Sequence, residues 1–230
     1  MKVLVSPTPE AAARLAAEHL ARAAASAIAE RGNFSVALSG GSTPKLMYQA
    51  LRGLDIDWTH VHVYFSDERS VGPDSPDSNY LSAKTELLDH VGVPAGQVHR
   101  IQGERDPVQA AADYAALLPA QLDLVLLGMG DDGHTLSLFP GTEVVHEQTA
   151  WTKAYFLDQQ HMYRLTLTAP VVNRASCVLF LVAGPKKAAP LREVLEGDYQ
   201  PDTYPAQVIK PVSGELIWMV DEKAAADLKP

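Results

Sequence analysis

The sequence has few of the features that mark secreted, membrane-embedded or nucleic-acid-binding proteins. It contains one cysteine, Cys177, so no internal disulfide can form and nothing argues for an oxidising compartment. Its apolar runs are far shorter than the roughly 20 residues that a bilayer span needs. Prolines at positions 7 and 9 interrupt the first run, so we expect no secretory leader and a cytoplasmic protein. Basic residues are outnumbered as well, since 19 Lys and Arg against 28 Asp and Glu give a net charge of −9. That balance argues against nucleic acid or an anionic membrane as a general partner.

The composition is otherwise that of an ordinary folded protein. The chain has 230 residues, of which 47% are hydrophobic, and its mean hydropathy is −0.07. A chain of this length can bury a core without metals or disulfides. It contains no internal repeat or low-complexity tract, and the Pro-, Asp- and Ser-rich stretch at residues 71–78 is too short to separate domains. We therefore expect one α/β domain over residues 1–230.

Short β-type runs alternate with longer helical segments. The predicted strands are residues 2–5, 34–38, 61–65, 122–127, 151–156, 163–168, 177–182 and 216–220. The predicted helices are residues 9–31, a segment that begins near Pro44, and residues 77–90, 107–118 and 186–195. This alternation predicts a doubly wound, mostly parallel sheet with helices on both faces. In such sheets ligands bind in the loops at the carboxyl ends of the strands.

The first loop of interest has the sequence SGGSTP and occupies residues 39–44, between a strand and a helix. Gly40 and Gly41 allow backbone N–H groups to converge on a ligand, and Ser42 and Thr43 add hydroxyl donors. The N-terminus of the following helix carries partial positive charge, so the loop suits a phosphate group. It lacks the spacing of a P-loop, and a tight turn with an ordinary helix cap is an equally good interpretation.

The second loop, residues 66–69, has the sequence SDER and directly follows a predicted strand. Asp67, Glu68 and Arg69 could position or polarise a substrate. A solvated charge cluster is the simpler interpretation of the same residues.

The third loop has the sequence GMGDDGH, residues 128–134, and matches the dinucleotide pattern GxGxxG. We reject a dinucleotide site because its two aspartates would repel a pyrophosphate and because the motif lies past the middle of the chain. A histidine beside carboxylates at the end of a strand suits acid–base catalysis, since Asp132 can set the tautomer of His134. The alternative is that His134 caps a short helix.

Other candidates are weaker. His60 and His62 alternate on one predicted strand face, but no third ligand is nearby, so we expect no metal site there. The chain has neither GxSxG nor HExxH, which removes common serine-hydrolase and zinc-protease motifs. Cys177 lies in an apolar run and is interpreted as core. Arg164 and Lys187, taken alone, are isolated cations.

Together these segments resemble the 6-phosphogluconolactonase family over essentially the whole chain. The matching segments are LSGGSTP at 38–44, DER at 67–69, SNY at 78–80, GMGDDGHTLSLFP at 128–140, RLT at 164–166, GPKK at 184–187, Trp218 and Asp221. One departure is Leu136, where the family usually has a small residue. The wider superfamily includes glucosamine-6-phosphate deaminases, which usually have tyrosine in place of Arg69 and continue towards FNEP where this chain has SLFP.

The resemblance implies a Rossmann-like fold and hydrolysis of 6-phospho-D-glucono-1,5-lactone in the oxidative pentose phosphate pathway, with no cofactor and no metal. His134 is the expected general base and Asp132 its orienting acid. Arg69 is expected to stabilise the oxyanion and Asp67 to contact sugar hydroxyls. The expected phosphate ligands are Gly40, Gly41, Ser42, Thr43, Arg164 and Lys187.

Two other functions remain open. One is a sugar-phosphate deaminase or isomerase, and the other is a non-enzymatic sugar-phosphate sensor domain. For a lactonase the partner is a small sugar-phosphate lactone, and we expect a monomer. Because an acidic protein must then bind an anion, we expect Arg69, Arg164 and Lys187 to converge near His134.

Overall fold

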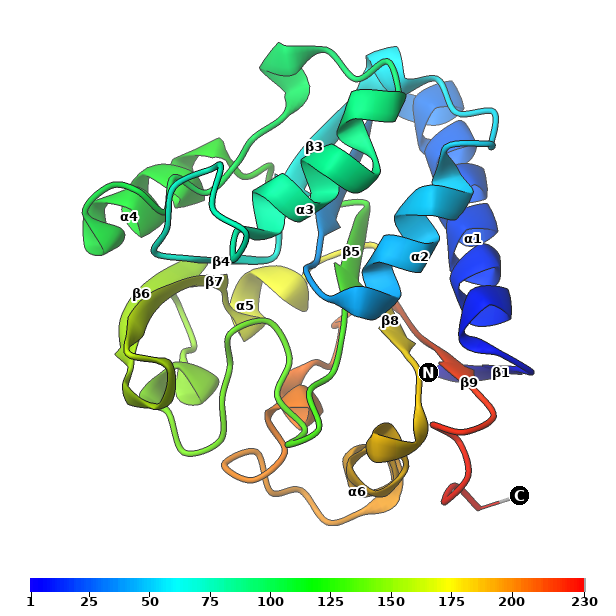
Figure 1. The fold of residues 1–230 in the computed structure, drawn as a ribbon, viewed down its shortest axis with the longest axis vertical. Coiled ribbons are helices and arrows are strands. Elements are labelled where there is room, and N and C mark those ends of the chain that lie inside the picture. The colour runs from blue at the N-terminus through cyan, green and yellow to red at the C-terminus, as the bar shows by residue number, and fades with distance from the viewer. Residues whose placement is uncertain (230) are drawn as a thin grey trace.

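The computed structural model describes residues 1–229, and a six-stranded parallel sheet forms its centre (Figure 1). In spatial order the strands are β1 (Lys2–Ser6), β9 (Glu215–Asp221), β8 (Cys177–Val182), β5 (Leu124–Leu127), β2 (Phe34–Leu38) and β3 (Val61–Phe65). Every neighbouring pair is parallel. This confirms the predicted α/β class with its mostly parallel sheet.

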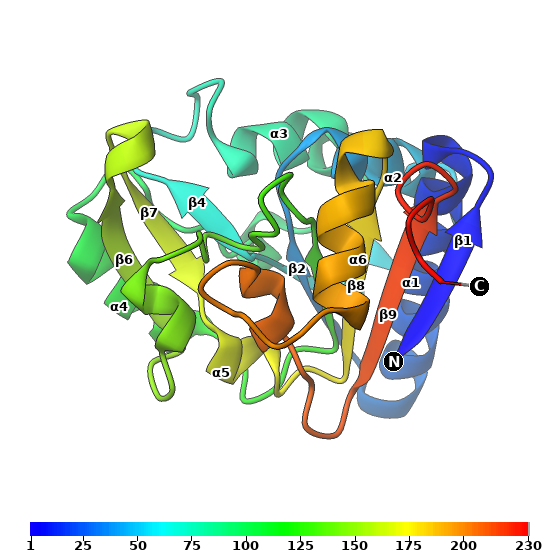
Figure 2. The same cartoon turned by 90° about the horizontal axis from the view of Figure 1, so that it is seen from below.

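Helices cover both faces of this sheet, which explains why its inner strands are almost entirely apolar. All residues of β2, β5 and β8 are buried. Helix α1 (Pro9–Arg31) and helix α6 (Ala188–Glu196) lie on opposite faces of the β8–β9 region, as Figure 2 shows. A parallel strand that is covered on both sides has no polar face to present, so hydrophobic residues run through it without alternation.

Helix α1 is long because its ends are well terminated and its buried face is made of small residues. Thr8 accepts a hydrogen bond from the Ala11 amide at the N-terminus, Pro9 occupies the first turn, and Gly32 ends the helix with φ of 80°. The buried face contains Leu20 and six alanines. Alanine favours helix and lets the helix axis approach the sheet closely.

The order of the strands places a switch point between β2 and β5. From β2 the chain winds outward to β3 on one side, whereas β5, β8 and β9 continue on the other. Loops that leave the carboxyl ends of β2 and β5 therefore diverge and leave a crevice between them. The segments SGGSTP and GMGDDGH are these two loops.

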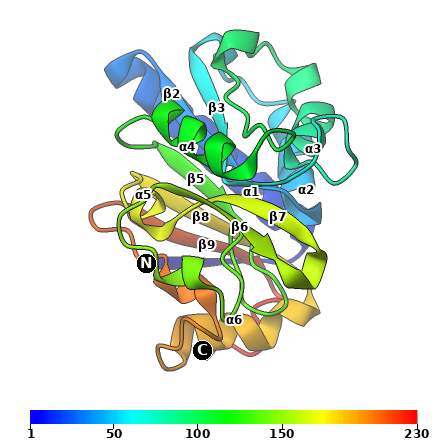
Figure 3. The same cartoon turned by 90° about the vertical axis from the view of Figure 1, so that its left-hand side faces the viewer.

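The structure corrects the prediction for residues 66–69, which were expected to be a loop. Asp67–Arg69 forms strand β4, which pairs antiparallel with β7 (Met162–Leu167). Strand β7 pairs in turn with β6 (Thr152–Leu157), so these three strands form a second sheet. Figure 3 shows this sheet beside helix α4 (Pro107–Leu117), on the side of the molecule away from α1. Sequence pattern identifies strands well but does not say which strands pair.

Smaller differences concern helix ends. The helix predicted at 77–90 is α3 (Asn79–Glu86), followed by a separate 3₁₀ turn over Leu88–His90. Helix α2 (Ser42–Leu51) begins two residues before Pro44, and a short α5 (Ala169–Val172) was not predicted. Among the described residues, no helix combines the length and apolar character that crossing a bilayer requires.

Candidate active site

A cavity of about 240 Å³ opens at the carboxyl ends of the parallel strands, beside the switch point. Its polar lining consists of Ser39, Ser42, Thr43, Asp67, Arg69, Asn79, His134, Thr135, Arg164 and Lys187, with Gly40, Gly41, Gly128 and Gly130. Of the residues predicted for the site, only Asp132 does not line the cavity, and it contacts His134 directly. The structure therefore brings together segments that are up to about 150 residues apart.

The loop after β2 leads into the N-terminus of α2. Gly41 precedes that helix with φ of 111° and ψ of 172°, a conformation that is open to glycine only. In the described chain no side chain caps this helix, so the backbone N–H groups of Ser42 and Thr43 keep their donors for a ligand. Gly40 packs directly against the side-chain amide of Asn79. Free backbone donors at the start of a helix are the arrangement that suits an anion.

The loop after β5 holds His134 in a fixed orientation. The Asp132 carboxylate accepts hydrogen bonds from Nδ1 of His134 at 2.6 Å and from its backbone N–H at 3.1 Å. The imidazole also stacks on Phe139, with ring centroids 4.1 Å apart. With Nδ1 as donor, the neutral ring has its lone pair on Nε2. Burial raises the pKa of Asp132, but the hydrogen bonds from His134 and its electrostatic attraction outweigh this effect, so the pKa is lowered and the carboxylate stays ionised at neutral pH.

Gly130 makes the contact between His134 and Asp132 possible. A Cβ atom at position 130 would lie 2.1 Å from Nδ1 of His134 and 2.5 Å from Oδ1 of Asp132. The loop amides bond within the loop, since Gly130 N donates to His134 O at 2.8 Å and Gly133 N to Gly130 O at 3.1 Å. These amides are therefore not free to surround a pyrophosphate. The glycines instead shape the turn that holds His134 against Asp132.

A buried ion pair joins the second sheet to the histidine loop. Nη2 of Arg164 on β7 lies 2.7 Å from Oδ2 of Asp67 on β4, and both side chains are almost fully buried. Ser137 donates to the same carboxylate oxygen at 2.6 Å and accepts from Arg164 Nε at 2.9 Å. Burial raises the pKa of Asp67, but the charges of Arg164 and Arg69 and the Ser137 hydrogen bond hold it below its ordinary value. Asp67 is therefore ionised, and it balances the charge of Arg164.

The other acid of this segment, Glu68, does not face the cavity. Its carboxylate accepts hydrogen bonds from the backbone N–H groups of Asn79 and Tyr80 and from the Ser78 hydroxyl, at 2.8 to 3.0 Å. Burial raises the pKa of Glu68, and these hydrogen bonds oppose the rise. Glu68 thus caps helix α3, and that helix presents Asn79 to the cavity. The Asn79 amide donates to Asp67 Oδ1 at 2.9 Å.

The three predicted cations do line one cavity together with His134, as expected. Their charges are balanced differently, however. Arg164 is paired with Asp67, and Lys187 Nζ lies 2.6 Å from Asp131 Oδ1 in the histidine loop. In residues 1–229 Arg69 forms no ion pair: Nη1 donates to the Asp77 carbonyl at 2.6 Å, and its buried Nε has no hydrogen-bond partner. Of the three cations, Arg69 therefore keeps guanidinium donors that a ligand can use.

Lys187 reaches the cavity from the turn after β8. Gly184 begins that turn, and its N–H donates to Asp221 Oδ1 at 2.9 Å. The same oxygen accepts from the Ala224 N–H at 2.9 Å. Asp221, which is 1% exposed, therefore ties the end of β9 to the turn that carries Lys187.

Leu136, the departure from the family pattern, has φ of 56°, in the left-handed region that non-glycine residues avoid. Its side chain is 7% exposed and lines the cavity. A left-handed residue costs about 1–2 kcal/mol, so burial of the leucine has to offset this cost. The turn places Ser137, the next residue, against Asp67.

The remaining histidines do not join this site. His60 lies in a 3₁₀ turn and not on the strand as predicted, and its Nδ1 lies 2.9 Å from Asp57. His62 on β3 contacts His99, with 3.1 Å between ring nitrogens.

Three residues of the site were not predicted from the sequence: Asn79, Asp131 and Ser137. All three lie inside segments that carry the resemblance, so only their contacts were unknown.

Comparison with known proteins gives a consistent result. The family model for glucosamine-6-phosphate isomerases and 6-phosphogluconolactonase matches residues 7–218. The 6-phosphogluconolactonase of Synechocystis sp. is 43% identical over 216 residues, 89% of this chain and 88% of its own. The structure of Trypanosoma brucei 6-phosphogluconolactonase superposes with a TM-score of 0.89 at 25% identity, covering 99% of this chain and 98% of that one. A monomeric glucosamine-6-phosphate deaminase shares the fold with a TM-score of 0.86 at 23% identity, covering 99% of this chain and 100% of that one.

The fold and the cavity define a doubly wound α/β protein that combines a helix-terminus anion site with a histidine–carboxylate pair. Within that class, the chain belongs to the family of glucosamine-6-phosphate isomerases and 6-phosphogluconolactonases.

The contact between Gly130 and the His134–Asp132 pair can be tested with Gly130→Ala. The added methyl group must displace the imidazole or the carboxylate, and a displacement of about 1 Å can reduce turnover about 100-fold. Gly96→Ala is the matched control, because a Cβ there meets nothing within 4 Å. Steady-state kinetics of both variants make the comparison. Equal kcat for Gly130→Ala and the wild type would contradict a requirement for this geometry.

The buried carboxylate of Asp67 predicts how stability depends on pH. A carboxylate whose pKa is lowered by folding stabilises the protein above its ordinary pKa of 3.8, and this contribution is lost as the pH falls towards the folded value. We expect Asp67→Asn to lower the free energy of unfolding by about 3–5 kcal/mol at pH 7, because Arg164 is left buried and unpaired. The difference should shrink below about pH 4.

Urea denaturation at pH 7, 5 and 3 measures this difference. Asp74→Asn, at an exposed position, should stay within about 0.5 kcal/mol of the wild type throughout. If the difference in the free energy of unfolding between the wild type and Asp67→Asn did not change with pH, the charge of Asp67 would contribute nothing to stability.

Proposed function

We propose that the protein hydrolyses 6-phospho-D-glucono-1,5-lactone to 6-phospho-D-gluconate. One observation carries the proposal: a single cavity holds both the oriented His134 and the free N-terminus of α2. A phosphorylated lactone needs these two features at a distance that one small sugar can span. The relatives named 6-phosphogluconolactonase support the same substrate.

In the proposed mechanism His134 acts as general base through Nε2. It removes a proton from a water molecule, whose oxygen attacks the lactone carbonyl and pushes the electron pair onto the carbonyl oxygen. When the tetrahedral intermediate collapses, the bond to the ring oxygen breaks and the imidazolium returns its proton to that oxygen. The products are a carboxylic acid, which ionises, and a free hydroxyl. Asp132, kept ionised at neutral pH, stabilises the imidazolium between the two proton transfers.

Arg69 is the proposed stabiliser of the oxyanion. In the described chain it forms no ion pair, and it retains guanidinium donors beyond the one used for the Asp77 carbonyl. Its full charge is therefore available where negative charge develops, inside a partly enclosed cavity in which such a charge acts strongly.

Asp67 is better suited to positioning than to proton transfer. Its oxygens accept from Asn79, Ser137 and Arg164, and its pKa is lowered, so it is a weak base. A role as base, such as the matching acid has in the related deaminases, is disfavoured by this network. We propose that Asp67 fixes Arg164 and Asn79 and contacts the sugar hydroxyls.

The phosphate would lie at the N-terminus of α2, bound by the amides near Gly40 and Gly41 and by Ser42 and Thr43. Lys187 adds a point charge, after leaving Asp131. Arg164 offers its remaining N–H groups, with its net charge already balanced by Asp67. Binding energy gained at the phosphate can then position the carbonyl at His134.

We also propose a monomer acting in the cytoplasm, in the oxidative pentose phosphate pathway. The cavity brings together the proposed base and the proposed phosphate site within one protomer, so a monomer would be sufficient for catalysis. The proposed substrate is the lactone that oxidation of an aldose 6-phosphate releases, which supports the pathway.

One assay separates this function from its rivals. Lactone consumption is followed at a pH where spontaneous ring opening is slow, and ammonia release from glucosamine 6-phosphate is measured in parallel. Lactone hydrolysis without ammonia is expected. Ammonia release would indicate a deaminase, and ligand binding without turnover would indicate a sensor domain.

The role of His134 predicts the effect of His134→Ala. Loss of a general base should lower kcat by about 10²- to 10⁴-fold, with a smaller effect on KM. His146→Ala is the matched control, since His146 also lies 2.6 Å from a carboxylate, that of Asp202, but is exposed and outside the cavity. Near-normal turnover of His134→Ala would exclude it as the base.

The ion pair of Lys187 with Asp131 predicts opposite effects for its two partners. Lys187→Ala should raise KM about 10- to 100-fold, which corresponds to the loss of a charge-assisted hydrogen bond. Asp131→Asn should lower KM about two- to fivefold, because phosphate no longer competes with a partly exposed ion pair. Lys186→Ala, at the exposed neighbouring position, is the control. A rise of KM in Asp131→Asn would show that the pair positions Lys187 and does not compete with phosphate.

A further inference from the structure

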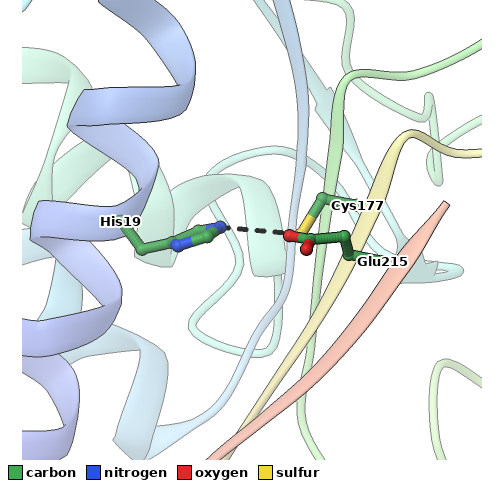
Figure 4. Close-up of side chains that lie close together, drawn as sticks. All are labelled: His19, Cys177 and Glu215. Carbon is green, nitrogen blue, oxygen red and sulfur yellow. Dashed lines mark hydrogen bonds between the residues drawn. The ribbon is translucent and has the colours of Figure 1, made fainter. Parts of the chain in front are cut away.

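A second cluster of reactive side chains lies at the amino ends of the parallel strands, at the opposite end of the sheet from the cavity. Cys177 is the first residue of β8 and Glu215 the first residue of β9, whereas the cavity opens at the carboxyl ends of the parallel strands. The two residues are direct partners in the register of these strands, so their side chains leave the same face of the sheet. Figure 4 shows them side by side.

His19 completes the cluster from helix α1, which packs on that face (Figure 4). Its Nε2 atom lies 3.7 Å from Sγ of Cys177. The nitrogen, the sulfur and a carboxylate oxygen of Glu215 all lie within 4.8 Å of one another. The neighbouring buried residues of α1 are Ala16, Ala17 and Leu20, so an imidazole is the exception on an otherwise apolar face.

We propose that His19, Cys177 and Glu215 form a binding site for Zn²⁺. Imidazole nitrogen, thiolate sulfur and carboxylate oxygen are the three ligand types that zinc takes in proteins, and a mixed N, S, O set disfavours Mg²⁺ and Ca²⁺. This inference is independent of the proposed lactonase activity.

The geometry needs only a small adjustment. Tetrahedral ligands at zinc distances of 2.0–2.3 Å are roughly 3.3–3.8 Å apart, so the three atoms must close in by about 1 Å. The side chain of Glu215 is 53% exposed and can make this movement, while Cys177 and His19 are held by β8 and α1. Solvent at the exposed side supplies the fourth ligand.

Two of the ligand groups must change before they can bind the ion. The Cys177 thiol loses its proton to solvent, because the thiolate is the ligand. The ion pair between Lys2 Nζ and Glu215 Oε1, at 2.7 Å, opens to free the carboxylate. Lys2 therefore competes with the metal, and this competition gives the site a distinctive test.

The experiment uses the full chain, free of affinity tags and stripped of metal. Calorimetric titration with Zn²⁺ should give one ion per chain, and at a hundredfold excess over Kd the melting temperature should rise by about 5–10 °C. Substitution by Co²⁺ should produce the near-ultraviolet absorption of a thiolate-to-metal charge transfer. Absence of binding, or binding without the thiolate band, would overturn the proposal.

Variants distinguish this site from other metal-binding groups. Cys177→Ser should abolish the thiolate band, and Glu215→Gln, at an exposed position that does not threaten folding, should weaken binding at least about tenfold. Lys2→Met should tighten binding about two- to fivefold, because it removes the competing ion pair. His60→Gln, which removes an exposed histidine paired with Asp57, is the control and should change nothing. Binding that survives Cys177→Ser and is lost in His134→Ala would place the metal at the cavity and refute the site.

Discussion

The buried pair of Asp67 and Arg164 is the interaction on which the cavity depends. It joins β4 to β7 within the second sheet, and through Ser137 it holds the loop that carries the histidine. Through Asn79 it also fixes α3 against the glycine loop. A buried charge is tolerated only when it is paired and hydrogen-bonded, so each of these partners is required for the others. Three separate parts of the chain are thereby held at one place.

The charges in the cavity form pairs, so most of its cations are already balanced. Arg164 is balanced by Asp67, Lys187 by Asp131, and His134 hydrogen-bonds Asp132. Within residues 1–229, the cavity groups that keep donors for a ligand are Arg69 and the N–H groups at the start of α2. In the proposed function, attraction for a phosphorylated substrate therefore comes from fixed dipoles, one unpaired guanidinium and a lysine that can exchange partners. The overall charge of −9 matters little at this range, because salt screens distant charges.

Much of the fold could be predicted from local pattern. The apolar runs, the helix caps at Thr8 and Gly32 and the loops at strand ends are local signals, and they place every strand of the main sheet to within a few residues. The class of the fold and the loops that form the cavity follow from them. The pairing of β4 with β7, which makes the second sheet, could not be predicted, because it depends on contacts between residues about 100 positions apart.

Local sequence patterns identify the residue types available for chemistry and the two loops that carry them, because glycines, a helix start and a histidine beside aspartates leave a local signature. The contacts of each charged side chain follow instead from its neighbours in the folded protein. Glu68 and Asp67 are neighbours in the chain, yet one caps α3 and the other anchors Arg164. Cys177, correctly predicted to be buried, also meets His19 and Glu215 across two elements. Charge balance and burial are properties of spatial neighbours, and these neighbours exist only once the chain has folded.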